Sequence, residues 1–218
     1  MPRALFEKTG NAVWISHLDL MRLFQRAFKR AGLPLTHTQG FNPRPSVSIA
    51  LPLSVGVESR CELLDFDLDG MDVPCDEICR RLNGALVEGV RVLSVYDNGS
   101  KIKNLALLRS VVTLEYDKGV PEGAREQISD LLRRPALTVE KKGKNGITEQ
   151  DIIPMLRGWA IRAEAHTIEL ELLACCQNPT LNPMQLHAAI CRYLPELTPD
   201  FAKCRRLELY DTNENIFR

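Results

Sequence analysis

The sequence lacks several features that would place it in a specialised class of protein. Its 218 residues include 28 basic and 28 acidic side chains, so the formal net charge is zero and a globally basic nucleic-acid-binding protein is not supported. No apolar run approaches the roughly 18–20 residues that a membrane-spanning helix needs. The N-terminus becomes charged too early for a secretory signal. We therefore expect a cytoplasmic protein without a membrane segment.

Motifs for common cofactors are also missing. The sequence contains no CxxC, no GxGxxG and no P-loop pattern, so neither a structural zinc site nor a phosphate-cradling loop is predicted. The seven cysteines show no disulfide spacing and are expected to be thiols. Cys75 and Cys79 begin the CxxxCxxC pattern of radical S-adenosylmethionine (SAM) enzymes, but Leu82 occupies the third position. We expect no cofactor and no metal.

What is present indicates an α+β protein with two domains. A turn-rich stretch at 97–101 separates residues 1–98 from residues 105–218, and both parts follow the order strand, helix, strand, strand, helix, strand. This order predicts two tandem ferredoxin-like (βαββαβ) domains, with antiparallel sheets and helices on one face. The second domain would carry an insertion near 142–165. The clearest helix is expected at 17–31 and is followed by Gly32 and Pro34.

Basic side chains gather on this helix and on the loop that follows it. Helical spacing places four cations on one polar face, opposite an apolar stripe: Arg22, Arg26, Lys29 and Arg30. The loop GFNPRP adds Phe41, Asn42 and Arg44. One interpretation is a solvated helix face beside a stiff loop. The other is an RNA-binding surface, with phosphates on the cations, a base stacked on Phe41, and polar contacts from His17 and Asn42.

Two further groups suggest other functions. His17, in the first turn of the helix, and His37, just before the GFNPRP loop, are candidate general bases for a metal-independent ribonuclease. Seven acids and no base lie between Cys61 and Cys79. Among these acids, Asp65, Asp67 and Asp69 alternate along an expected strand and could dock a basic partner protein.

Four segments resemble the radical SAM-linked protein family, a bacterial domain of unknown function. They are FEKTG at 6–10, ISHLDLMRLFQRAFKRAGLP at 15–34, QGFNPRPSVSIALPLSVGVES at 39–59 and DIIPML at 151–156. Members are fused to, or encoded beside, a cobalamin-binding-type radical SAM protein, so the resemblance implies a radical SAM partner and supplies no catalytic residues. The N-terminal pattern is also similar to CRISPR RNA-processing endonucleases, whose C-terminal glycine-rich loop this chain lacks.

Three functions follow as hypotheses. The first is an accessory protein that binds RNA and presents it to a radical SAM enzyme. The second is a protein-interaction module that docks a radical SAM partner through the acidic face. The third is a metal-independent endoribonuclease.

Overall fold

The structure of the protein is a computed structural model that describes residues 1–143 and 146–218. The chain forms two units, one made of residues 1–104 with Arg218 and the other of residues 105–217. Both units combine antiparallel strands with helices, and the described residues contain four α-helices. Among these residues, no helix is both long enough and apolar enough to cross a bilayer.

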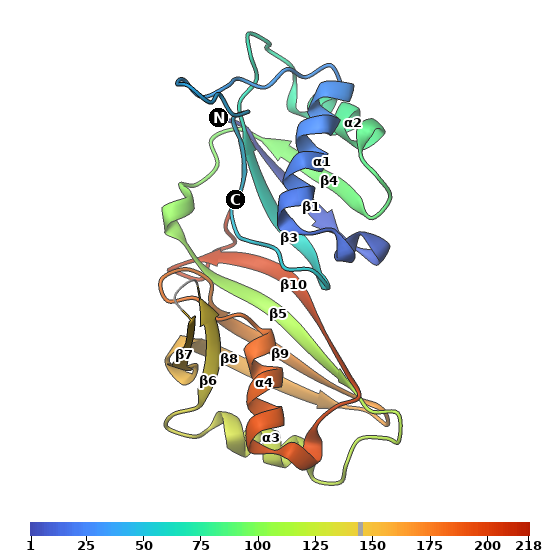
Figure 1. The fold of residues 1–218 in the computed structure, drawn as a ribbon, viewed down its shortest axis with the longest axis vertical. Coiled ribbons are helices and arrows are strands. Elements are labelled where there is room, and N and C mark those ends of the chain that lie inside the picture. The colour runs from blue at the N-terminus through green and yellow to red at the C-terminus, as the bar shows by residue number, and fades with distance from the viewer. Residues whose placement is uncertain (144–145) are drawn as a thin grey trace. The chain divides into compact units, whose positions relative to one another are not determined.

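The first unit contains four strands and two α-helices. The strands lie in the order β4-β1-β3-β2, and every neighbouring pair is antiparallel. Helices α1 and α2 cover one face of this sheet (Figure 1). The bounds are β1 (Arg3–Lys8), α1 (His17–Arg30), β2 (Val47–Ile49), β3 (Val57–Phe66), α2 (Cys75–Ala85) and β4 (Val90–Tyr96).

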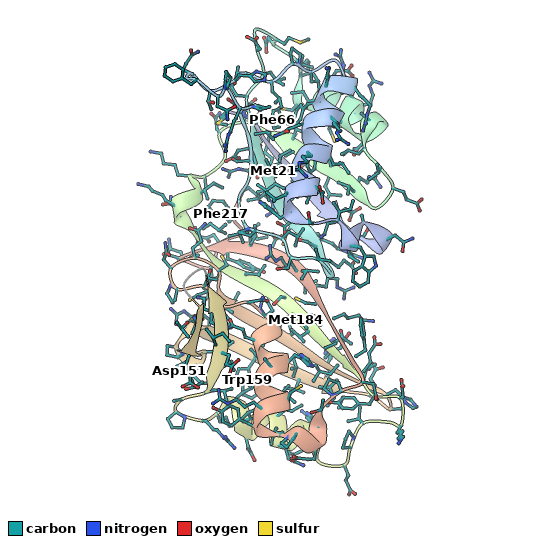
Figure 2. All side chains as sticks on the ribbon, in the orientation of Figure 1. Met21, Phe66, Asp151, Trp159, Met184 and Phe217 are labelled. Carbon is teal, nitrogen blue, oxygen red and sulfur yellow. The ribbon has the colours of Figure 1, made fainter. Side chains whose placement is uncertain are left out.

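Helix α1 is held by its apolar stripe and by both of its ends. Its buried residues are Leu20, Phe24, Ala27 and Phe28. The helix contacts the sheet through two ring pairs, Phe24 with Phe6 at 4.7 Å and Phe28 with Phe66 at 4.8 Å between centroids. Phe66 on β3 is labelled in Figure 2. Ser16 caps the N-terminus because its hydroxyl accepts the backbone N–H of Asp19 at 3.2 Å.

The C-terminus of α1 ends in a Schellman motif. Gly32 takes a left-handed φ of +65° and donates its N–H to the Lys29 carbonyl. Leu33 donates its N–H to the Phe28 carbonyl at 3.0 Å. The helix therefore stops at Arg30, and Leu33 becomes fully buried next to the end of the helix.

Strand β3 differs from the strand expected around 64–68. It begins earlier, at Val57, and ends at Phe66. The chain beyond Phe66 pairs with a different segment, because the Asp67 carbonyl accepts the N–H of Thr36 and Leu68 bridges to Leu35. This pairing attaches the segment that follows α1 to the end of the sheet.

The second unit has the strand order β10-β5-β9-β8, also with antiparallel pairs. A separate hairpin lies outside this sheet, formed by β6 (Thr138–Gly143) and β7 (Gly146–Asp151). The remaining bounds are β5 (Leu105–Glu115), α3 (Ala124–Leu132), β8 (Leu156–Ala163), β9 (Thr167–Cys175), α4 (Met184–Tyr193) and β10 (Phe201–Asp211).

The extra segment of this unit starts and ends earlier than the predicted insertion at 142–165. The additional element is the hairpin, and residues 156–163 form β8, the edge strand of the sheet. Half-exposed Trp159 and Ile161 alternate there with exposed Ala160 and Arg162, which suits an edge strand. Residues 144–145 of the predicted insertion lie outside the described residues.

Candidate functional site

The exposed face of α1 carries a column of three arginines. A helix turns by about 100° per residue, so residues four apart lie one above the other. Arg22, Arg26 and Arg30 follow this spacing, are exposed, and line one groove of about 440 Å³. We call these three residues the basic column. The groove is completed by Ile15, Asp19, Leu23 and Val87.

The arginines of the basic column differ in their partners. Arg22 pairs with Asp19 at 3.0 Å, with both side chains more than half exposed. Arg30 donates to the Ala85 carbonyl at 2.5 Å, which links α1 to the end of α2. Within residues 1–143 and 146–218, the Arg26 side chain makes no hydrogen bond or ion pair. Arg26 is therefore available to an external anion.

Asp19 keeps the groove from being purely basic. Its carboxylate accepts the Ser16 hydroxyl at 2.7 Å and an Arg22 N–H at 3.0 Å. These hydrogen bonds, that of Ser16 first, lower the pKa of Asp19 below its usual value. Asp19 is thus ionised at neutral pH and holds Arg22 in place along the helix.

The loop of residues 36–46 follows α1 and carries a solvent-exposed aromatic ring at its tip. Its two arms are joined by backbone bonds from Ser46 to the Thr36 carbonyl and from Thr38 to the Arg44 carbonyl. The Thr38 hydroxyl also accepts the N–H of Arg44 at 3.0 Å. At the tip, Phe41 is the most exposed large apolar side chain. Asn42 and Arg44 beside it are exposed as well.

A second pocket, of about 460 Å³, lies where α1 meets this loop. Its buried wall comes from Phe28, Leu33 and Leu35, which are between 0 and 8% exposed. Pro34 and Pro45 add further apolar surface, and the polar lining residues are Gln25, Lys29 and His37. Lys29 therefore lies both on the exposed face of α1 and in this pocket.

The two candidate catalytic histidines do not form one site. His17 is the first residue of α1 and His37 lies in the loop after its other end, and the 14 residues of the helix span about 20 Å. His17 lines neither pocket, and its buried Nδ1 has no hydrogen-bond partner among the described residues. His37 is exposed and lines the second pocket. A general-base role for either histidine stays a prediction.

The acidic stretch is partly engaged inside the first unit. Asp65 forms a bidentate ion pair with the buried side chain of Arg3, with N–O distances of 2.5 and 3.1 Å. Asp67 accepts the Thr36 hydroxyl at 3.0 Å, and Asp69 is exposed. Asp65 therefore has a structural partner, and Asp67 and Asp69 remain the exposed members of the predicted docking face.

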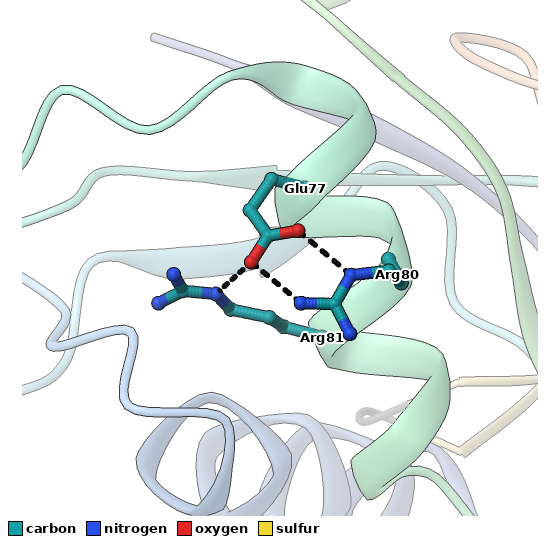
Figure 3. A network of polar contacts seen from close by, with 3 residues as sticks. All are labelled: Glu77, Arg80 and Arg81. Atoms are coloured by element: carbon teal, nitrogen blue, oxygen red, sulfur yellow. Dashed lines mark hydrogen bonds and ion pairs between the residues drawn. The ribbon is translucent and has the colours of Figure 1, made fainter.

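Glu77, on α2, is another acid of this stretch that is paired with arginines of the same unit. Its carboxylate accepts hydrogen bonds from Arg80 and Arg81 at 2.6–2.7 Å (Figure 3). The bonds from Arg80 and then Arg81 lower its pKa to about 2.

Several basic side chains of the second unit are held in ion pairs. Arg109 pairs with Glu171, and Lys203 pairs with Glu115 at 2.5 Å. Arg192 pairs with Glu149 at 3.1 Å and lies 5.5 Å from the ring centre of Tyr193. In the part of the chain that the structure describes, no group of three or more His, Cys, Asp or Glu residues could hold a metal ion. The α1 face is therefore the better candidate for binding an anion.

Sequence reasoning found the cations of α1 but missed the second pocket. Gln25 and Phe28 fall within the helix expected at 17–31, and Leu33 falls just after it. Nothing in the sequence indicates that Leu35 lies beside them in one pocket. A glycine stop followed at once by a buried leucine, Gly32-Leu33, is the pattern that predicts a Schellman end. The contribution of Val87 to the first groove had no sequence signal.

Comparisons with known proteins give a fold and a family. No curated protein matches the chain. A chain in the crystal structure of a Cbf5-Nop10-Gar1 complex is similar, with a TM-score of 0.50 and 9% sequence identity. The match covers 95% of this chain and 48% of that one, so the protein spans about half the length of this structural neighbour. At this identity the likeness concerns the fold alone. The family profile that matches residues 2–183 shows that the chain belongs to DUF2344, uncharacterized proteins conserved in bacteria.

Proposed function

We propose that the protein binds single-stranded RNA through the basic column, Lys29 and the 36–46 loop. The observation that carries this proposal is that the Arg26 guanidinium is exposed and has no partner among the described residues. It stands in the middle of the column, is exposed, lines a groove, and makes no hydrogen bond or ion pair with the described residues. A guanidinium in this position suits the oxygens of a phosphate, which it can contact through two parallel hydrogen bonds.

The loop supports RNA in preference to another polyanion. Phosphate contacts position a nucleic acid without reading it, whereas exposed aromatic rings stack on unpaired bases. Phe41 is fully exposed at the tip of a loop whose arms are hydrogen-bonded to each other. These bonds hold the two arms of the loop together in the free protein, so stacking on the ring at its tip costs less ordering than it would in an unbraced loop. Arg44 and Asn42 would add a phosphate contact and a polar contact.

We also propose that each unit is a ferredoxin-like domain. In the first unit the element order is βαββαβ and the strand order β4-β1-β3-β2. In the second, β10-β5-β9-β8 gives the same arrangement once the β6-β7 hairpin is set aside. These sheets would serve as rigid supports for the helices and loops that carry the surface.

The role that we propose for this RNA-binding protein is to present RNA to a radical SAM enzyme in the cytoplasm. The partner is inferred from the family resemblance in the sequence. The protein would then act as an accessory subunit without catalytic residues of its own. The acidic-face hypothesis has weaker support, since Asp65 is engaged by Arg3. The ribonuclease hypothesis has weaker support, since neither the Nδ1 of His17 nor the ring of His37 has a hydrogen-bond partner among the described residues that would orient it as a base.

Charge reversal tests the RNA contact directly. We expect the double variant Arg22→Glu/Arg26→Glu to lose most of the affinity of the full chain for a labelled 12-nucleotide RNA, measured by fluorescence anisotropy at low salt. The matched control is Arg60→Glu/Arg91→Glu, which changes the net charge equally at two exposed strand positions of the same unit. Equal losses in the two variants would contradict the proposal, as would no loss in either.

A pulldown from native cytoplasm, divided into nuclease-treated and untreated halves, tests the partner. We expect a radical SAM protein together with RNA in the untreated half, and no RNA with the Arg22/Arg26 variant. A radical SAM protein retained in both halves without RNA would favour docking through Asp67 and Asp69.

A further inference from the structure

We propose that the pocket between the end of α1 and the 36–46 loop binds an unpaired nucleobase, with the adjoining phosphate on Lys29. The inference rests on the proposed function where the base belongs to RNA, and the same chemistry would also take a free nucleotide. The experiment below separates these two sources.

The walls of the pocket suit a flat, largely apolar ring. Phe28 and Leu33 lie at the floor of the cavity and are fully buried, because the Schellman motif turns the chain back beside the last turn of α1. The apolar surface that a base can contact therefore comes from Pro34, Leu35 and Pro45. Leu35 and Pro45 continue the apolar lining from the two arms of the loop. A volume of about 460 Å³ falls within the usual range for small-molecule sites, and such sites are mostly apolar with a few oriented polar groups.

The polar groups around this lining are free to bind. Within the described ranges, the side chains of Gln25, Lys29 and His37 make no hydrogen bond or ion pair. A glutamine amide offers a donor and an acceptor side by side, the arrangement that pairs with the edge of a base. An imidazole offers one donor and one acceptor more. Three unpartnered polar side chains around one apolar wall are the arrangement that a base requires.

The positive charge of Lys29 indicates where the phosphate of the nucleotide would bind. Lys29 lines the pocket and also belongs to the exposed basic face of α1, next in sequence to Arg30 of the basic column. A nucleotide with its base against Leu35 and Pro45 can therefore reach a cation without leaving the pocket. The basic column would hold further phosphates of an RNA strand, and the pocket would supply contacts to a base that phosphates cannot provide.

Isotope-labelled full chain titrated with adenosine monophosphate tests the pocket without any RNA. We expect saturable amide shifts at Phe28, Leu33 and His37, and binding of ribose 5-phosphate, the same molecule without its base, that is at least about tenfold weaker. The variant Gln25→Ala/His37→Ala removes only partly or fully exposed side chains and should weaken adenosine monophosphate binding by about tenfold. Arg60→Glu, at an exposed position of β3 that lines neither the pocket nor the groove, should leave this binding unchanged.

The outcomes separate the two proposals. Equal binding of the two small molecules, or no shifts at the pocket, would overturn the pocket even if an RNA oligomer still binds the basic column. Pocket binding of adenosine monophosphate with no binding of RNA would support a free-nucleotide site and overturn the proposed function. Pocket binding that Gln25→Ala/His37→Ala leaves intact would show that the polar groups do not recognise the base.

Discussion

Replacing Asp65 by alanine distinguishes a structural role of the acidic strand from a docking role. Arg3 is 4% exposed, and its guanidinium donates hydrogen bonds to both Asp65 carboxylate oxygens, at 2.5 and 3.1 Å. Removing one partner of a buried pair costs about 3–5 kcal/mol, because the other charge stays buried without compensation. Asp65 is itself 21% exposed, and Arg3 keeps its bond to the Ser100 carbonyl at 2.8 Å. We therefore expect a loss of about 2–3 kcal/mol in the free energy of unfolding.

Urea unfolding at neutral pH measures this loss in the first unit alone. The chain has two tryptophans, so a Trp159→Phe background leaves Trp14 as the reporter. In that background, Asp69→Ala serves as the control, because Asp69 is exposed and its loss should change stability by less than about 0.5 kcal/mol. The double variant Arg3→Met/Asp65→Leu should recover most of the stability, since apolar groups replace both charges. An Asp65→Ala midpoint equal to that of Asp69→Ala would refute the reasoning.

Three further changes test the account of the first unit. Gly89→Ala should destabilise by about 2 kcal/mol or more, since φ is +81° and a Cβ would lie 2.5 Å from the Thr9 carbonyl oxygen, and an unchanged or raised urea midpoint would contradict this. Gly84→Ala, in open space on α2, should stabilise by up to about 1 kcal/mol, and a lowered urea midpoint would contradict that. The Glu77 carboxyl should titrate near pH 2 by carbon-13 NMR, and the stability that its depressed pKa supplies should be present above about pH 4.5 and disappear as the pH falls to about 2. A Glu77 midpoint near 4.5 would show that the arginine contacts do not persist in solution. Lys8→Met should destabilise by about 1.5–3 kcal/mol, because the fully buried ammonium donates to the Val13 and Ile15 carbonyls at 3.1 and 3.2 Å; an unchanged urea midpoint would show that these bonds contribute nothing.

Local features of the first unit could be read from the sequence, because they depend on neighbouring residues. The Ser16 cap, the apolar stripe of α1 and the span of β4 depend on residues within a few positions of one another. The exposed cations on α1 follow from helical spacing in the same way. These features required no knowledge of which segments meet in the fold.

Features that depend on contacts between distant segments of the chain could not be predicted from the sequence. Arg3 and Asp65 are 62 positions apart, and a carboxylate in an acidic run gives no sign of a buried partner. The end of β3 depends on pairing with the chain around Leu35, and the second pocket depends on the same pairing. The edge strand β8 was hidden because its partly exposed pattern resembles an insertion.

The salt dependence of RNA binding tests the central claim most directly. If the basic column, Lys29 and Arg44 each contact a phosphate, the slope of log K against log salt should be about −3.5 for single-stranded RNA, since each of the five contacts contributes about −0.7. Arg26→Ala should reduce the magnitude of this slope by about 0.7, while Arg60→Ala should leave it unchanged. This pair of results would show that Arg26 contacts a phosphate. An Arg26→Ala slope equal to that of the unmodified protein, or no RNA binding at low salt, would contradict the account.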